Sequence, residues 1–486
     1  KNIILFDESS VRNFSLFKMF HDEKEIARLR EDIKFFCRCE NEGIRTLLGD
    51  FQDSQKIYDM EMLSIPELRI RKTLKIHPLH TYYVSKPEIS VKDWDLHLLI
   101  IGFGKLGQQM LLQTMNQGVV SSTNNILVDV VDFDIEKKSS IFANAFSERY
   151  VQIKDDRITI LPEQADGKFQ IRFHQMDIRY KQFYNLLKTC GDNDGIYTYA
   201  AICVEDEEVG IHCLTEIQRY LRESVTMEEH NNIKIAIRME MDKYMKEYLN
   251  SNDKTFSNVI AFEENKDVIT LEELFHDKLD EEAKEYNRIY NHIQIQKADD
   301  KKQTNKDKNA NAVSAQKVEN ETGNLKTASV QNPASKDTIA EAKKLWRELE
   351  LFKRDSNRAL AEHSMIKEVV WNKILEENQG GNLEAWFGQA GSILKANGTT
   401  WIYEDEDAFV EQQSDKNAYP IVSEMSRLEH RRWCYFMASR GWSSTSENDV
   451  DEKKNICLCT WDDLVEVNKE TCKYDLMWLL KKCNEN

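Results

Sequence analysis

The residues with the clearest chemical pattern are three glycines that follow an apolar run, Gly102, Gly104 and Gly107. Their G-x-G-x-x-G spacing, after the strand-like "LHLLII" and before a helix-forming segment, is typical of a turn that binds phosphate. Gly102 would make the tight turn, Gly104 would let the backbone approach a pyrophosphate, and Gly107 would let the helix pack on the strand. The anion would then lie at the helix N-terminus, in contact with Lys105 and Leu106 of the same turn.

Two carboxylates follow the next strand-like run, "VDVVDFD", at Asp132 and Asp134. A carboxylate at this place accepts hydrogen bonds from a ribose, and Asp132 is preferred because it directly follows the apolar part of the strand. An acid there would repel a 2′-phosphate, so the pattern favours NAD or another adenine nucleotide over NADP. The alternative is that the glycines only permit close packing in a fold that binds no ligand.

The elements that must position this turn alternate between strand-like and helix-like patterns from 87 to 262. Six apolar runs with helical segments between them predict an α/β fold with a Rossmann-like, doubly wound parallel sheet, and we place this nucleotide-binding domain at 87–295. Strand-like runs at 2–6 and 33–39 predict that residues 1–86 form part of another Rossmann-like unit and a connector.

The composition predicts how the rest of the chain is divided. A chain of 486 residues is too long for one hydrophobic core, so several domains are expected. Residues 296–336 contain few large apolar side chains, which predicts a disordered linker. Helical patterns and tryptophans return after it, which predicts a separate, mainly α domain at 337–486.

Charge and cysteine content exclude some function classes. With 66 basic and 84 acidic residues the net charge is −18, which argues against nucleic acid as the main partner. The ten cysteines include no Cys-x-x-Cys pair, so they are interpreted as reduced thiols and no metal site is predicted. No apolar run is long enough to cross a bilayer, and we expect a cytoplasmic protein.

The pattern from "LLIIGFGKLGQQML" through "VDVVDFDIEKK", "HQMDIR" and "TYAAICVEDEE" to "IKIAIRM" resembles the TrkA-N, or RCK, type of nucleotide-binding regulatory domain. In that family the ends of successive strands surround an adenine nucleotide, and the resemblance adds Asp177 and Asp206 to the ligand contacts. The opening of the chain, through "IKFFCRCENEGIRTLL" and "IPELRIRKTLKIHPL", resembles the fourth strand to the fifth helix of such a domain and its trailing connector. Residues 1–60 would then be half of a first Rossmann-like unit. The chain opens at Lys1 within a strand-like run, so the resemblance implies a preceding segment.

The C-terminal part resembles the RyR domain, the repeat named for ryanodine receptors, through "LWRELELFKRDSNRALAEH" and "SRLEHRRWCYFMASRGWSS". The matching signature residues are Glu429, His430, Arg432, Trp433, Gly441, Trp442 and Trp461. The resemblance implies a site for a ligand or partner, with Asn357 and Arg358 of the "SNR" turn as further candidates. Trp433 and Trp442 could stack a base with Arg432 beside them, or they could be core residues.

These observations favour a regulatory protein that senses a nucleotide without consuming it. The sequence contains no P-loop, G-x-S-x-G or H-E-x-x-H motif. The family resemblance implies the cytosolic, ligand-responsive part of a homo-oligomeric potassium-channel-like assembly, with a membrane portion upstream of Lys1 that holds it at the inner face of the cell membrane. The alternatives are an NAD-dependent oxidoreductase or NAD-consuming enzyme, and a scaffold without a ligand.

Overall fold

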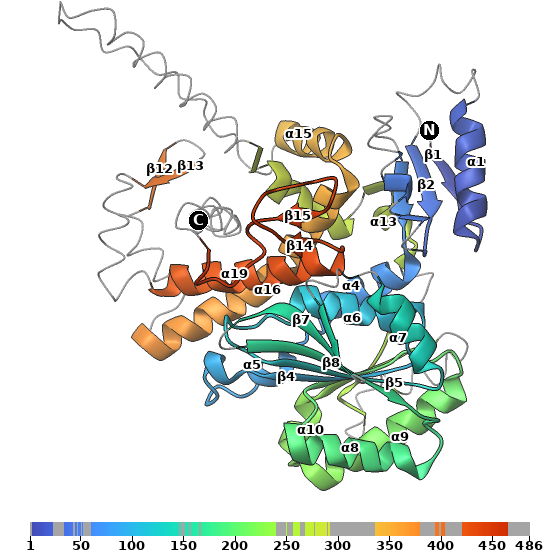
Figure 1. Ribbon diagram of the computed structural model, residues 1–486, viewed down its shortest axis with the longest axis vertical. Helices are drawn as coiled ribbons and strands as arrows, with labels where there is room; N and C mark the ends of the chain where they lie inside the picture. The colour runs from blue at the N-terminus through green and yellow to red at the C-terminus, as the bar shows by residue number, and fades with distance from the viewer. Residues whose placement is uncertain are drawn as a thin grey trace, which may run out of the picture.

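Figure 1 shows the computed structural model of the chain. It describes residues 2–22, 34–41, 44–45, 47–49, 51, 60–144, 146, 151–154, 157–164, 167–239, 249, 256–262, 268–276, 278–288, 290–291, 336–379, 394–397, 400–403 and 420–464. Most of the predicted linker, 296–335, therefore lies outside the described residues.

Eight strands form one sheet, called here the main sheet, in the order β11-β10-β9-β4-β5-β8-β7-β6. In chain order they are β4 (Leu96–Ile101), β5 (Ile126–Asp132), β6 (Val151–Lys154), β7 (Arg157–Gln164), β8 (Gly167–Gln175), β9 (Tyr199–Ile202), β10 (Lys234–Ile237) and β11 (Val259–Ala261). The six from β11 to β8 run parallel, and β7 and β6 add an antiparallel edge. The chain starts at the central β4, builds outward through β5 and β8, and then continues on the other side through β9, which is the order of a Rossmann-like sheet. The predicted α/β class is confirmed.

Helices cover both faces of the main sheet, and all six residues of β4 are buried in consequence. The helices are α6 (Lys105–Gln117), α7 (Ile135–Ala143), α8 (Lys181–Asp194), α9 (Glu207–Ser224) and α10 (Met227–Asn232). Figure 1 shows α8, α9 and α10 on one face and α6 on the other. The connections that follow β4 and β9 therefore leave towards opposite faces.

A second parallel sheet, the N-terminal sheet, precedes the main sheet in the chain. It consists of β1 (Asn2–Leu5), β2 (Lys34–Arg38) and β3 (Met60–Leu63) in that order, with α1 (Ser10–Asp22) after β1. The helix α4 (Ile65–Ile76) follows β3; its N-cap Ser64 accepts a hydrogen bond from the backbone N–H of Glu67. Because α4 packs on α6, it joins the two sheets. The chain reaches β4 through α5 (Thr81–Val84) and η2 (Val91–Asp93).

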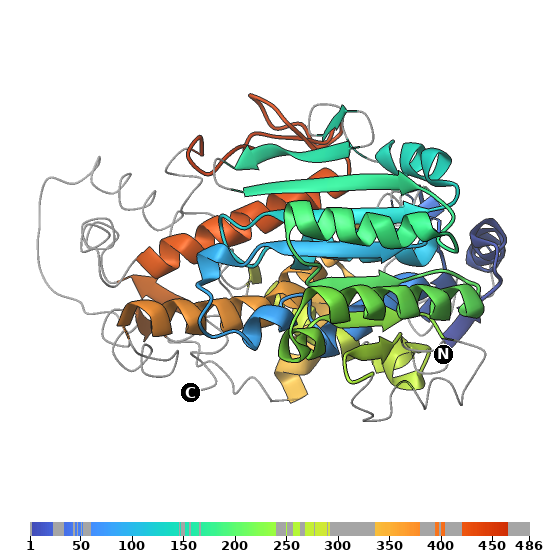
Figure 2. The same cartoon turned by 90° about the horizontal axis from the view of Figure 1, so that it is seen from below.

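The described C-terminal residues are mainly helical, and they pack against the elements of the main sheet. Its elements are α15 (Lys336–Arg347), α16 (Leu351–Gln379), β12 (Leu394–Asn397), β13 (Thr400–Tyr403), α19 (Pro420–Ser439), β14 (Ser443–Ser444) and β15 (Lys454–Asn455). Both α16 and α19 pack on α6, and their buried side chains belong to the same hydrophobic core as those of β4. Figures 1 and 2 both show these orange and red helices on the face of the main sheet opposite the green α8 and α9.

Polar contacts fix this packing. The guanidinium of Arg431 on α19 donates to the side-chain oxygen of Asn124 at 2.9 Å and to its carbonyl oxygen at 2.6 Å. The imidazole of His363 on α16 donates through Nε2 to the carbonyl oxygen of Val119 at 2.7 Å. The residues after α6 therefore depend on C-terminal side chains to satisfy their buried polar groups.

A buried network of ion pairs attaches α16 to the N-terminal sheet and to η3 (Lys278–Asp280), which follows α13 (Leu271–His276). Arg358 lies 2.6 Å from Asp280 and 2.8 Å from Glu61 of β3, and Arg71 of α4 lies 2.6 Å from Asp280. Burial alone would raise the pKa of Asp280, but Arg358 and Arg71 hold that pKa well below its usual range. The charges are thus mutually compensated inside the fold.

Among the helices in the described part of the chain, none combines the length and apolar content needed to cross a membrane.

Candidate functional site

A cleft of about 840 Å³ lies where the carboxyl ends of both parallel sheets meet. Its walls include the ends of β4, β5, β8 and β9 of the main sheet, and Arg38, Glu40 and the start of α4 from the N-terminal side. Because the connections after β4 and β9 leave on opposite faces, a crevice opens between these connections beyond the strand ends, which is the usual ligand position in such sheets. Of the residues predicted to bind a nucleotide, the cleft brings together Gly102, Gly104, Lys105, Leu106, Asp132 and Asp177.

The three glycines differ in what surrounds them. Gly102 has a φ of +87°, and a Cβ there would lie 2.9 Å from the backbone nitrogen of Val204. A Cβ at Gly107 would lie 2.0 Å from the carbonyl oxygen of Gly102, so the helix can approach the strand only without a side chain. A Cβ at Gly104 would meet no atom within 4 Å, because this residue faces the cleft.

Gly104 is also the N-cap of α6, and it supplies no side chain to cap the first turn. The first backbone N–H groups of a helix have no acceptor within the helix, and the helix dipole places partial positive charge there. The wall of the cleft at Gly104 therefore suits an anion.

Asp132 ends β5 and is already hydrogen-bonded. Its carboxylate accepts from the backbone N–H of Phe103 at 2.6 Å and from the ammonium of Lys138 at 2.7 and 2.8 Å. Burial would raise the pKa of Asp132, but the hydrogen bonds from Lys138, Phe103 and Asp134 lower it on balance. Since Lys138 compensates the negative charge, the sequence-based argument that Asp132 repels a 2′-phosphate is weakened.

The other predicted acids lie in three different settings. Asp177 lines the cleft and makes a two-point contact with Arg179, which lowers the pKa of Asp177 to about 2. Asp206 is the N-cap of α9 and accepts from the backbone N–H of Val209. Asp134 is the exposed N-cap of α7 and is not among the lining residues. At the end of β9 the acid that lines the cleft is Glu205.

Sequence reasoning missed several side chains of the cleft. Phe133, between the two predicted acids, is 75% exposed and lines the cleft, so its ring is available for stacking. Lys138, Arg179 and Arg238 add positive charge from the main sheet. Arg38 comes from β2 and carried no local signal, because only the packing of the two sheets brings it here.

The C-terminal residues predicted to form a ligand site do not lie together in the cleft. Arg432 is buried and binds Glu429 at 2.7 Å, and Lys367 contacts the other oxygen of Glu429. Burial would raise the pKa of Glu429, but Arg432 and Lys367 hold it well below its usual range. Arg432 thus lies in a buried ion-pair cluster with Glu429 and Lys367, away from the cleft.

The aromatic residues of this region are mostly packing groups. Trp442 is buried and lies 5.4 Å from the ring of Phe352. The ring of His430 lies between Trp433 and Trp461, at 6.0 and 5.7 Å, and its Nε2–H donates to the carbonyl oxygen of Cys459. The remaining candidates lie on α16, where Asn357 bonds to the backbone of its own helix and Arg358 belongs to the buried ion network.

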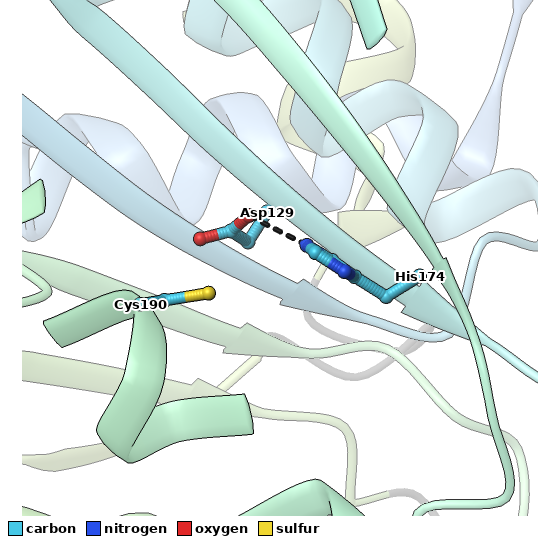
Figure 3. A group of neighbouring side chains, drawn as sticks. All are labelled: Asp129, His174 and Cys190. Carbon is cyan, nitrogen blue, oxygen red and sulfur yellow. Dashed lines mark hydrogen bonds and ion pairs between the residues drawn. The ribbon is translucent and has the colours of Figure 1, made fainter. Parts of the chain in front are cut away.

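A separate cluster of Asp129, His174 and Cys190 lies between the main sheet and α8 (Figure 3). The carboxylate of Asp129 accepts two hydrogen bonds from Arg172, at 2.6 and 2.7 Å, and others from His174 and His97. Burial raises the pKa of the Cys190 thiol to about 11. A cation here would face the guanidinium of Arg172 and a protonated thiol, so the residues fit a metal poorly.

No family model, no curated protein and no solved structure matches the chain. Its function is therefore inferred from the geometry of the cleft.

Proposed function

We propose that the cleft binds an adenine nucleotide, either a mononucleotide or a dinucleotide such as NAD, as a regulatory ligand. The observation that carries this proposal is the placement of Gly104. Gly104 is the N-cap of α6 and supplies no side chain to cap the first turn. It opens into the cleft, and it lies where the connections after β4 and β9 leave towards opposite faces. This combination suits a phosphate group with the rest of a nucleotide beside it.

The cleft has room and suitable chemistry for the whole ligand. A volume of about 840 Å³ is within the range of small-molecule and cofactor sites. The phosphates would lie on the first turn of α6 near Lys105. The ribose would reach the end of β5 by sharing Asp132 with Lys138, and the base would stack on Phe133.

We infer a sensing role because the cleft has walls from two sheets and connects to the C-terminal helices. A nucleotide that contacts both walls would favour one arrangement of the two sheets over others. The helix that starts at the phosphate turn, α6, carries α16 and α19 on its surface, so a shift of α6 would reach them directly. The resemblance to TrkA-N/RCK domains and to the RyR repeat supports this role and suggests a homo-oligomeric, channel-like assembly with a membrane portion.

The test is to denature the purified full-length chain and identify released nucleotides by mass spectrometry, then to titrate the chain with NAD, ADP and ATP. We expect saturable binding of at least one nucleotide that is recovered unchanged after incubation. Conversion of NAD to a reduced or cleaved product would favour an oxidoreductase or NAD-consuming enzyme. Absence of binding to all three would favour a scaffold and overturn the proposal.

A further inference from the structure

Lys105, which follows Gly104 in the glycine turn, is already paired with a carboxylate from the N-terminal sheet. Lys105 is the first residue of α6, directly after Gly104. Its ammonium lies 2.7 Å from Oε2 of Glu40, which follows β2 of the N-terminal sheet. This ion pair crosses the cleft, because both residues line it from opposite sheets.

Glu40 is held firmly from its own side. Its Oε1 accepts from Arg38, at 2.8 Å from Nε and 2.6 Å from Nη2, and its backbone N–H donates to the hydroxyl of Ser10 at 3.1 Å. The Glu40 side chain is 6% exposed. Burial would raise the pKa of Glu40, but Lys105 and Arg38 lower it on balance, so the carboxylate is charged at neutral pH.

Lys105 is the more mobile partner of this pair. Its side chain is 62% exposed, so it can turn towards another anion at little cost, whereas Arg38 retains Glu40 in place. A phosphate group at Gly104 would bring more negative charge than one carboxylate, and it would also gain from the helix N-terminus. Glu40 and a phosphate of the ligand would thus compete for the ammonium group of Lys105.

We propose that Glu40 occupies the position on Lys105 that a phosphate of the ligand takes, so that nucleotide binding and the Lys105–Glu40 ion pair exclude each other. This inference rests on the proposed function, because it assigns a regulatory role within the same cleft. Glu40 acts as an internal competitor that lowers the apparent affinity for the nucleotide. Binding releases the ion pair between the N-terminal sheet and α6, and the two sheets are then joined through the ligand.

The test is calorimetric titration of the full-length chain with NAD, ADP and ATP, comparing the wild type with Glu40→Gln. We expect the affinity for the bound nucleotide to rise about tenfold, since an amide competes for an ammonium far less well than a carboxylate. The rise should disappear when Glu40→Gln is combined with Lys105→Gln. Glu8→Gln is the matched control, because it removes the same charge from an exposed residue of the cleft lining and leaves Lys105 paired with Glu40; we expect at most about a twofold rise.

Several outcomes would overturn the inference. One is an unchanged or reduced affinity in Glu40→Gln while the wild type binds, which leaves the proposed function intact. Another is an equal rise in Glu8→Gln, because the effect would then be general repulsion between the ligand and the acidic residues of the cleft. If melting shows that Glu40→Gln is unfolded, Glu40→Asp serves instead, since the shorter side chain keeps the charge but draws back from Lys105; it too must raise the affinity. If the wild type binds none of the three nucleotides, the proposed function itself is contradicted.

Discussion

Gly107 lies so close to Gly102 that a Cβ at position 107 would stand 2.0 Å from the carbonyl oxygen of Gly102. Alanine is normally the better helix former, by about 1 kcal/mol. Here the contact with backbone outweighs that preference, and we expect Gly107→Ala to lower the free energy of unfolding by about 3 kcal/mol. Urea-induced unfolding measures this change. Gly104→Ala is the control, expected to cost no more than about 1 kcal/mol because its Cβ would meet no atom within 4 Å. Equal losses in the two variants would contradict the assigned geometry.

Phe133 is expected to bind the base of the nucleotide without supporting the fold. Stacking on one aromatic ring contributes about 1 to 3 kcal/mol, so Phe133→Ala should weaken binding by roughly ten- to a hundredfold with little change in melting temperature. Ile141→Ala is the matched control, since Ile141 is also exposed but is not among the residues that line the cleft. Titration of both variants with the nucleotide that the wild type binds measures the change in affinity. Normal affinity in Phe133→Ala would show that the base lies elsewhere.

The buried histidine of α16 predicts how stability depends on pH. Burial lowers the pKa of His363 to about 4, below the value of about 6.5 for an unfolded chain. Between these values the unfolded state binds more protons, so stability falls as pH decreases from about 6.5 to 4. Each such histidine contributes a slope of about 1.4 kcal/mol per pH unit. His363→Asn keeps a donor for Val119 without titrating, and should show a shallower decline in denaturant unfolding between pH 6.5 and 5. Identical slopes in variant and wild type would count against this assignment.

The shared core predicts that the two halves of the chain need each other. Fragments 1–295 and 337–486, produced together as separate chains, should co-purify, because α16 and α19 bury their apolar faces on α6. Size-exclusion chromatography of the mixture checks this expectation. The control is Arg431→Ala in the C-terminal fragment, which removes the hydrogen bonds to Asn124 and should weaken the association. If the two fragments fold independently and elute separately, the result would instead support the separate domain expected from sequence.

The glycine turn and Asp132 could be found in the sequence because their signals are local: a strand, a spacing of glycines and an acid at the end of the next strand. The partner of Lys105 could not, since Glu40 is 65 residues away and only the packing of two sheets brings them together. The docking of α19 was missed for a similar reason. Arg431 resembles a surface arginine in sequence, but it is buried against Asn124 more than 300 residues away. The role of Trp442 could not be predicted either, because a tryptophan in a motif gives the same sequence signal whether it lines a ligand site or packs in a core.

The measurement that tests the central claim most directly is calorimetric titration of full-length Gly104→Val with NAD, ADP and ATP, beside the wild type. A Cβ at position 104 would meet no protein atom within 4 Å and would face the cleft, so we expect the variant to fold and to lose the room for a phosphate at the start of α6. We predict saturable binding to the wild type and none to Gly104→Val, with melting temperatures within a few degrees of each other. Equal affinity in a folded Gly104→Val, or no binding of any of the three nucleotides to the wild type, would contradict the account.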